Sequence, residues 1–369
     1  MNNILQTGKD KIAPKAQALI MELRGLIEET RAVTAATVNA GLTLLYWKIG
    51  QRTRQEVLTE TRADYGKQIV LTLSRQLVVD YGSGFSEKNL RRMIQFSEIF
   101  PEKQIVVSLS RQLSWSHFLA LLPLAQPLQR YFYAEMCRVE GWSVRTLRKK
   151  IDSMLYERTA ISKKPEEVAK AEIDALHDED RLTPDLVFRD PYVLDFLGIN
   201  DRYLEKDMED AILQEMERFL LELGAGFAFL ARQKRIQIDN DDFYIDLLFF
   251  HRSLKRLIAI EIKLGGFKAE YKGQMELYLR WLDKHERRPD EEPPMGIILC
   301  AGKKDEQIEL LELDRSHIHV AEYLTDLPPK KVLKQKFHEA IQRSRKRLDQ
   351  KVNNVNDVTT LQKKGEILP

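Results

Sequence analysis

The chain has 369 residues, of which 43% are hydrophobic and 31% charged, a composition typical of a soluble globular protein. Its length predicts two domains. A run of about 18 apolar residues is absent, which excludes a transmembrane helix, and the N-terminal residues lack the apolar core of a secretion signal. We therefore expect a cytoplasmic protein without a membrane partner. The 58 basic and 56 acidic residues nearly cancel, so net charge identifies no partner.

The first 160 residues are predicted to be almost entirely helical. Apolar residues recur at spacings of three and four, which is the period of an amphipathic helix. The expected helices include residues 19–27, 38–49, 65–79, a helix from Ser86 to about 100, 116–122, 128–140 and 143–158. We expect this all-α region, residues 1–160, to form one domain.

Part of this region resembles a helix-turn-helix. The turn Gly82-Ser83-Gly84 separates two predicted helices, and Ser86 is a suitable N-cap for the second. Basic and amide side chains suit phosphates and base edges. The candidate nucleic-acid-binding residues are Lys88, Asn89, Arg91 and Arg92, with Arg145 and Arg148 on the capped basic helix that begins at Ser143. The alternative is an ordinary helical bundle whose charged faces are solvated.

The second half of the chain has a mixed pattern. Residues 161–189 are predicted to be a linker, residues 190–330 a second domain and residues 331–369 a basic helix and tail. Within the second domain we expect a helix over 203–223, β-type runs at 227–230, 235–238, 243–250 and 257–264, a helix over 269–285, and strands at 295–300 and 318–323. The order αβββαβ includes a crossover whose two strands should be parallel and buried, which places the domain between the α+β and α/β classes.

Three charged residues lie within these apolar strands. Asp246 lies in FYIDLLFF, and Glu261 and Lys263 lie in LIAIEIKLGG. The side-chain period of a strand is two, so Glu261 and Lys263 should point to one face. Buried charges are paired or bind metal. Two carboxylates suit Mg²⁺, or Mn²⁺ in its place, and the lysine suits a water or a phosphate oxygen. The alternative is a buried Glu261–Lys263 ion pair.

Two neighbouring helices could complete this group. Glu209 shares an apolar stripe with Ile212 and Met216, so its carboxylate could reach the same metal, although Glu205 and Glu215 lie near that position. Gln274 and Tyr278 are four residues apart and therefore lie on one face of their helix. That face should cover the ends of the strands.

The pattern of Glu209, Asp246, Glu261-x-Lys263 and Gln274-x-x-x-Tyr278 resembles the PD-(D/E)xK nuclease superfamily. The stretches FYIDLLFFHRSLKRLIAIEIKLGGF and YKGQMELYL resemble its YhcG-type bacterial family, and YWKIG and GWSVRTLRKKI resemble the N-terminal half of that family. The resemblance implies a restriction-endonuclease-like fold and Mg²⁺-dependent phosphodiester cleavage. It also implies that Asp246, Glu261, Lys263 and Gln274 are catalytic, and that Asp246, Glu261 and Glu209 bind the metal. Ile245 replaces the proline of the superfamily motif.

These observations together predict a metal-dependent DNA nuclease, expected to be an endodeoxyribonuclease, that uses a metal-activated water. DNA is the expected partner, and a homodimer would provide the two sites that cutting both strands of a duplex requires. Two alternatives stay open at this point. The chain could be a non-catalytic DNA-binding protein, or an interaction subunit of a restriction- or defence-like complex.

Overall fold

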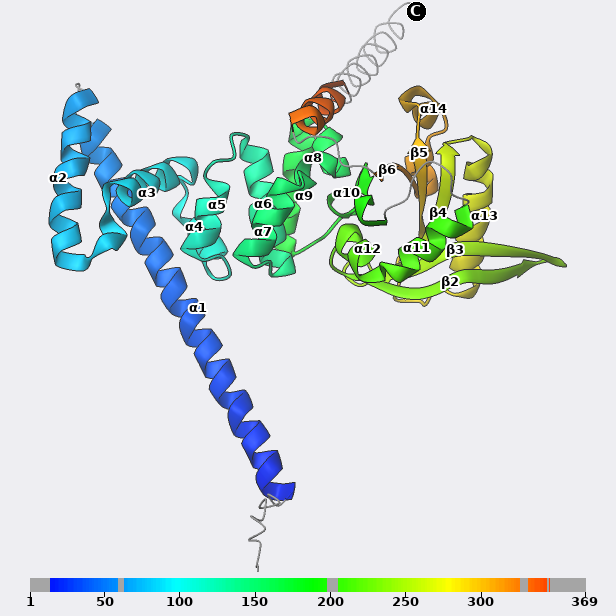
Figure 1. Ribbon diagram of the computed structural model, residues 1–369, viewed down its shortest axis with the longest axis horizontal. Coiled ribbons are helices and arrows are strands. Elements are labelled where there is room, and N and C mark those ends of the chain that lie inside the picture. The colour runs from blue at the N-terminus through cyan, green and yellow to red at the C-terminus, as the bar shows by residue number, and fades with distance from the viewer. Residues whose placement is uncertain (1–13, 59–62, 198–204, 326–330, 344, 346–369) are drawn as a thin grey trace, which may run out of the picture. The chain divides into compact units, whose positions relative to one another are not determined.

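The computed structural model describes residues 14–58, 63–197, 205–325, 331–343 and 345. The chain divides into two compact units (Figure 1). The first unit comprises the described residues up to Arg130 together with Met136–Leu147, and the second comprises Tyr131–Glu135 and the described residues from Arg148 onward. Within the described residues, no helix combines the length and the apolar character needed to cross a membrane.

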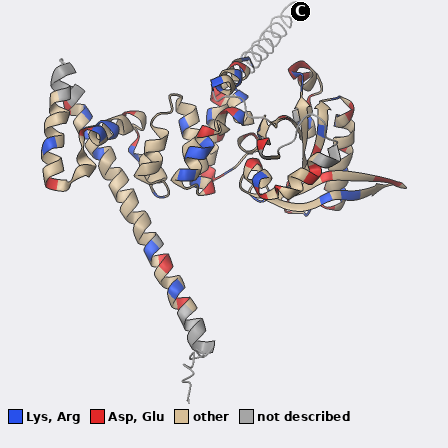
Figure 2. Ribbon diagram, in the orientation of Figure 1, with Lys and Arg blue, Asp and Glu red and all other residues tan. Residues whose placement is uncertain are grey.

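The first unit is helical, as the sequence predicts. Its elements are α1 (Pro14–Leu58), α2 (Ala63–Tyr81), the 3-10 helix η1 (Ser83–Phe85), α3 (Glu87–Ile99), α4 (Lys103–Ser110), α5 (Trp115–Leu121), most of α6 (Pro127–Glu140) and the start of α7 (Val144–Asp152). The two helical stretches expected before residue 50 belong to the single helix α1. Figure 2 shows that the middle of α1 carries no charged residue.

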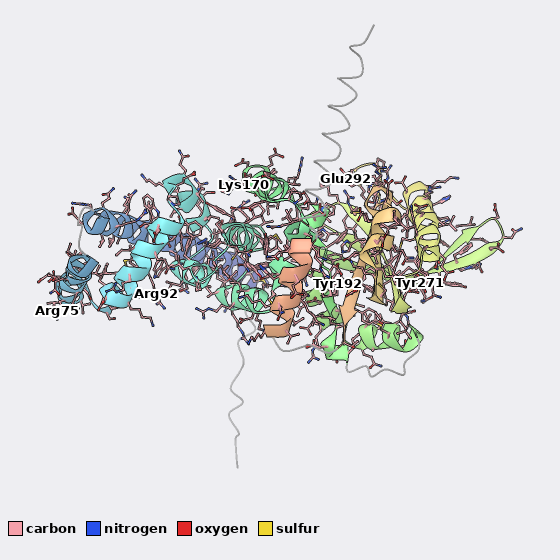
Figure 3. The ribbon with its side chains drawn as sticks, turned by 90° about the horizontal axis from the view of Figure 1, so that it is seen from above. Arg75, Arg92, Lys170, Tyr192, Tyr271 and Glu292 are labelled. Carbon is pink, nitrogen blue, oxygen red and sulfur yellow. The ribbon has the colours of Figure 1, made fainter. Side chains whose placement is uncertain are left out.

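The C-terminal part of α1 packs closely on α3. A Cβ at Gly50 would lie 1.8 Å from the backbone oxygen of Met93, so only glycine permits this approach. Trp47, on the same part of α1, is buried and donates its indole N–H to the backbone oxygen of Phe100 at 2.7 Å. The YWKIG stretch therefore fixes α1 against the rest of the first unit. Arg92, also on α3, is labelled in Figure 3.

The second unit contains helices and one mixed sheet. Its helices are α8 (Leu155–Arg158), η2 (Ala160–Lys163), α9 (Glu166–Glu179), α10 (Pro184–Val187), η3 (Asp195–Leu197), α11 (Glu205–Gln214), α12 (Met216–Leu223), α13 (Glu270–His285), α14 (Asp305–Leu310), η4 (Leu313–Ser316) and a C-terminal helix from residue 331. Its strands are β1 (Tyr192–Val193), β2 (Phe227–Ile238), β3 (Asp241–His251), β4 (Arg256–Gly266), β5 (Met295–Gly302) and β6 (Ile318–Leu324).

The sheet has the order β1-β6-β5-β4-β3-β2. Strands β2, β3 and β4 are antiparallel neighbours, whereas β4, β5 and β6 run parallel. Helix α13 connects β4 to β5, so the predicted crossover and its parallel strands are confirmed. The resulting αβββαβ order is that of the restriction-endonuclease-like fold.

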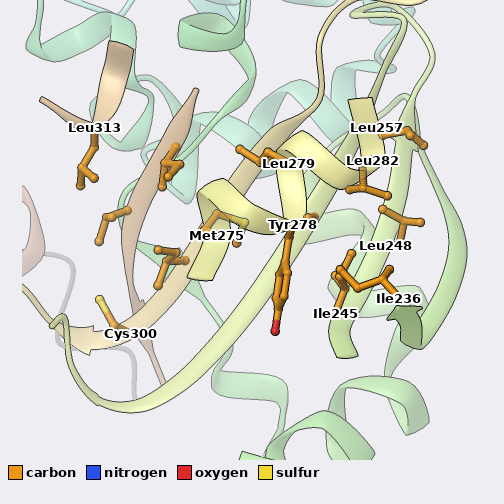
Figure 4. Close-up of a cluster of buried hydrophobic side chains, with 14 of the residues drawn as sticks. Ile236, Ile245, Leu248, Leu257, Met275, Tyr278, Leu279, Leu282, Cys300 and Leu313 are labelled. Carbon is orange, nitrogen blue, oxygen red and sulfur yellow. The ribbon is translucent and has the colours of Figure 1, made fainter. Parts of the chain in front are cut away.

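The two faces of the sheet are covered by different helices. Helix α13 buries Met275 and Tyr278 on one face, above Ile245 and other aliphatic side chains (Figure 4). A Cβ at Gly296 of β5 would lie 2.5 Å from Met275, so this glycine lets α13 approach the sheet. On the other face, α12 places Phe219 beside Phe249 of β3, with ring centroids 6.2 Å apart.

Several elements differ from the sequence-based expectation. The runs 227–230 and 235–238 belong to the single strand β2, which lies at the edge of the sheet, where polar side chains can reach solvent. The helix expected over 203–223 is interrupted at Glu215, which separates α11 from α12. The helix expected over 143–158 is interrupted before α8, where Met154 adopts a left-handed backbone with φ 52°. The expected linker 161–189 contains helices α9 and α10.

Candidate functional site

The site lies where β3 and β4 diverge. The regular pairing of these strands ends at Leu247 and Ile260. Beyond this pair, side chains replace the backbone ladder. The backbone N–H of Asp246 donates to Glu261 Oε1 at 3.3 Å, and that of Ile262 donates to Asp246 Oδ2 at 2.9 Å. The two carboxylates therefore lie side by side, each held by the backbone of the other strand.

Lys263 lies next to these carboxylates on β4. Its Nζ is 3.2 Å from Glu261 Oε2, which confirms that the two side chains share a face. The same ammonium lies 5.4 Å from the ring centroid of Tyr271, at the start of α13 (labelled in Figure 3). The Lys263 side chain is 11% exposed. The lysine is thus held by a carboxylate and an aromatic face, and it retains access to solvent.

The carboxyl group of Glu261 is in an unfavourable environment for a charge. Glu261 is only 3% exposed. The pKa of Glu261 is raised from 4.5 to about 8, because burial and, after it, the negative charge of Asp246 outweigh the attraction of Lys263. An additional positive charge at this position would favour the ionised form of Glu261.

Helix α11 brings a third carboxylate to the group. Glu209 is 5% exposed, and its Oε2 accepts a hydrogen bond from Gln233 Nε2 at 2.8 Å. Gln233 Nε2 also donates to Asp246 Oδ1 at 3.1 Å. Burial raises the pKa of Glu209, and the charge of Asp246 contributes in the same direction. Of the alternatives near Glu209, Glu215 pairs with Arg218 at 3.4 Å, and the side chain of Glu205 lies outside the described residues.

The first half of α13 covers this group. Gln274 Nε2 donates to the hydroxyl of Tyr278 at 2.7 Å, so the two residues share a face as predicted. Tyr278 is 2% exposed. Burial raises the pKa of its hydroxyl, and the charges of Glu261 and Asp246 raise it as well. Tyr278 therefore lies within electrostatic range of the carboxylates. The catalytic role that the resemblance implies for Gln274 stays a prediction.

The candidate nucleic-acid-binding residues lie on α3 and α7. On α3, Asn89 Nδ2 donates to the backbone oxygen of Gly84 at 3.1 Å, and Arg91 pairs with Glu87 at 2.7 Å. These bonds stabilise the turn and the helix itself. The exposed residues are Lys88 and Arg91 on α3 and Arg145 and Arg148 on α7, and Arg92 is partly exposed. The proposed contacts of all six with DNA stay a prediction.

Two residues of β2 belong to the site, although sequence reasoning gave them no role. Gln233 connects Glu209 with Asp246, as described above. Arg232 lies 3.5 Å from Glu209 through its Nε and pairs with Asp210 at 2.7 Å. The adjacent Arg-Gln pair before a polar run was the available signal, but a sequence does not show which side chains a strand directs toward carboxylates.

The donor set fits a hard divalent cation. Among the described residues, no group of three or more His, Cys, Asp or Glu side chains is gathered to hold a metal by itself. Mg²⁺ does not require one, because it commonly takes one or two carboxylates and keeps several water ligands. Asp246 and Glu261 supply adjacent carboxylates, and the charge of Asp246 is, after burial, a cause of the raised pKa of Glu261. Glu209 adds a third carboxylate through Gln233.

Two family models and a curated relative match this chain. A model described as the YhcG PDDEXK nuclease domain matches residues 185–339, and a model described as the DUF1016 N-terminal domain matches residues 22–158. The protein "Putative nuclease YhcG" of Escherichia coli (strain K12) is 35% identical over 340 residues, which cover 84% of this chain and 90% of the relative. The chain belongs to the YhcG family. Its second unit thus carries the PD-(D/E)xK nuclease domain of that family.

Solved structures give more distant matches to this YhcG-family protein. A repair endonuclease from Pyrococcus abyssi is 19% identical with a TM-score of 0.24, and the match covers 35% of this chain and 50% of that structure. The complex titled EndoMS-dsDNA2 is 16% identical with a TM-score of 0.25, and the match covers 32% of this chain and 46% of that structure. The chain therefore spans about half the length of these structures.

Proposed function

We propose that this YhcG-family protein is a Mg²⁺-dependent nuclease that hydrolyses DNA phosphodiester bonds endonucleolytically. The observation that carries the proposal is the reciprocal arrangement of Asp246 and Glu261 where β3 and β4 diverge, with Lys263 at 3.2 Å from Glu261. We assign the nuclease domain to residues 190–330 and a DNA-binding and assembly domain to residues 1–160.

Each residue has a distinct task in this proposal. Asp246 and Glu261 hold the cation, and Glu209 completes the acidic group. A bound divalent cation lowers the pKa of a water ligand and stabilises negative charge on a phosphodiester. The ammonium of Lys263 orients the attacking water and offsets phosphate charge, because its solvent access lets it contact both. Gln274, which donates to the hydroxyl of Tyr278 at 2.7 Å, orients Lys263 or a phosphate from the side that α13 covers.

The choice of DNA as substrate rests on the first 160 residues. Lys88 and Arg91 of α3 and Arg145 and Arg148 of α7 are exposed cationic side chains. Such side chains bind phosphates through interactions that salt weakens. Replacing Arg145 and Arg148 by glutamine should therefore weaken DNA binding and reduce its salt dependence, with the nuclease residues unchanged.

We also propose that α1 pairs with α1 of a second copy. No charged residue lies between Arg31 and Lys48, about four helical turns. Four aliphatic side chains of this segment are nevertheless 42–61% exposed, namely Val33, Val38, Leu42 and Leu45. An uncharged surface suits a copy of itself, because identical surfaces meet without like-charge repulsion. A dimer would also provide the two sites needed to cut both strands of a duplex.

Sedimentation tests the dimer. We expect a dimer at micromolar concentration for the wild type and a monomer for Val38→Glu, which places a charge in the middle of the apolar segment. The substituted residue is exposed, so the thermal unfolding of the second unit should not change. A monomeric wild type would contradict this part of the proposal.

Cleavage of plasmid and branched DNA with Mg²⁺ or Mn²⁺ tests the nuclease. We expect cleavage by the wild type and none by Lys263→Ala or Glu261→Ala. Lys268→Ala is the matched control, because Lys268 is a nearby lysine with a side chain that is 65% exposed. If all four proteins bind DNA and none cleaves it, the proposal of autonomous catalysis fails, and a non-catalytic or partner-dependent role is favoured.

A further inference from the structure

Gln233 connects the two carboxylates that come from different elements. Its single amide nitrogen donates to Glu209 of α11 at 2.8 Å and to Asp246 of β3 at 3.1 Å. Both N–H groups of the side-chain amide are thereby used. Gln233 of β2 therefore sets the distance between the carboxylates of Glu209 and Asp246.

The backbone of Gln233 is strained in a way that serves this connection. Its φ is +45°, a left-handed conformation that a residue other than glycine seldom adopts inside a strand. The flanking pairs, Arg232 with Leu247 and Lys234 with Ile245, place Gln233 opposite Asp246. A strained residue in a strand persists only when its surroundings impose it, and such residues are common at functional sites.

The chemistry of an amide suits this position better than that of a charged residue. Glu209 and Asp246 are two acidic side chains that share one donor, and the amide nitrogen of Gln233 bonds to both of them at 2.8 and 3.1 Å. A lysine at this position would neutralise the carboxylates and compete with a cation for them. A neutral amide holds one lone pair of each oxygen and leaves the negative charge in place.

We propose that Gln233 is a positioning residue that assembles Glu209 and Asp246 into one divalent-cation site before the cation binds. This inference rests on the proposed metal-dependent function and adds a residue to it. Removing a residue that orients a metal ligand typically weakens metal affinity by about 10- to 100-fold. Replacing Gln233 should therefore weaken the affinity for the cation more than it lowers the maximal cleavage rate at saturating cation.

The test is Mn²⁺ binding by the full-length protein without DNA, followed by the electron paramagnetic resonance signal of free Mn²⁺. We expect the dissociation constant to rise about 10- to 100-fold in Gln233→Ala and in Gln233→Gly. Gln237→Ala is the matched control, because Gln237 is an exposed glutamine on the same strand, and it should bind as the wild type does. Asp246→Asn should lose specific binding.

Thermal unfolding separates positioning from a purely structural role. Gln233→Gly should unfold at a higher temperature than Gln233→Ala, because glycine adopts φ +45° without strain. Both should nevertheless bind Mn²⁺ equally weakly. Wild-type affinity in Gln233→Ala, with binding lost in Asp246→Asn, overturns this inference and leaves the proposed function intact. If the wild type shows no Mn²⁺ binding that is lost in Asp246→Asn, both the inference about Gln233 and the proposed metal-dependent function are overturned.

Discussion

Glu261→Gln should stabilise the protein at neutral and alkaline pH and abolish cleavage. The pKa of Glu261 is raised from 4.5 to about 8 in the folded chain, with burial as the largest cause. A raised carboxyl pKa means that the folded state prefers the neutral form. Its contribution to stability is fully present below pH 4.5 and is lost as the pH rises to about 8. Glutamine has nearly the same shape and stays neutral.

The size of the effect follows from this pKa difference. One pKa unit corresponds to about 1.4 kcal/mol, so relative to low pH the folded protein loses on the order of 5 kcal/mol of stability above pH 8 and about 3 kcal/mol at pH 7. Glutamine retains an acceptor for the backbone N–H of Asp246. The pKa of about 8 already includes the attraction of Lys263, so the remaining offset is the cost of burying the amide N–H groups of glutamine. We therefore expect Glu261→Gln to be more stable by about 1–3 kcal/mol at pH 8.

The assay is denaturant unfolding in EDTA at pH 5 and pH 8. The two proteins should be nearly equal at pH 5 and should diverge at pH 8. Glu270→Gln is the matched control, because Glu270 is a glutamate of α13 with a side chain that is 69% exposed. Adding Mg²⁺ should stabilise the wild type and not Glu261→Gln, since a ligand stabilises only the state that binds it.

One result would refute this reasoning. If Glu261→Gln is less stable than the wild type at pH 8, Glu261 is ionised in the absence of metal and serves mainly as the partner of Lys263. The alternative of a buried Glu261–Lys263 ion pair would then be supported. The proposed cation site would lose its electrostatic basis.

Three further predictions concern other parts of the molecule. Gly50→Ala should destabilise the first unit by about 2 kcal/mol or more in denaturant unfolding, because Met93 lies in the way; Gly41→Ala, where the space is open, should not. Burial lowers the pKa of His251 to about 4, so protonation should cost the wild type about 3 kcal/mol between pH 6.5 and pH 4. His251→Gln should lose less stability over this range, and an equal loss would contradict the assignment. EDTA should abolish cleavage, and Mg²⁺ or Mn²⁺ should restore it; cleavage that persists in EDTA would exclude the metal mechanism.

The sequence predicted those parts of the fold that depend on local periodicity. Strand β4 follows from its continuous apolar run, which the sheet buries on both faces, and helix α13 follows from three- and four-residue spacings. The position of Glu261 beside Lys263 follows from the period of a strand. The buried series Ala169, Ile173 and Leu176 also carried a helix signal, but the polar residues around Pro165 and the proline itself led us to expect a linker there.

The sequence could not predict features that depend on packing between distant segments. The strand β2 continues through polar residues because it lies at the edge of the sheet, and edge position is a property of the whole sheet. The left-handed backbone of Gln233 leaves no trace in residue type, since glycine would be the expected residue there. The placement of Asp246 beside Glu261 needed the register of β3 and β4 as well as their patterns.

The buried ion pairs of the second unit affect where the chain can be cut. The region that matches the nuclease family model begins at residue 185. Glu222, however, pairs with Arg158 as well as Arg189, and Asp190 pairs with Lys163 as well as Lys303. A fragment starting at residue 185 would leave each of these carboxylates with one of its two cations, inside the protein, where a lost partner is costly. The shortest autonomously folding nuclease should therefore include α8 and η2, upstream of the boundary that sequence similarity marks.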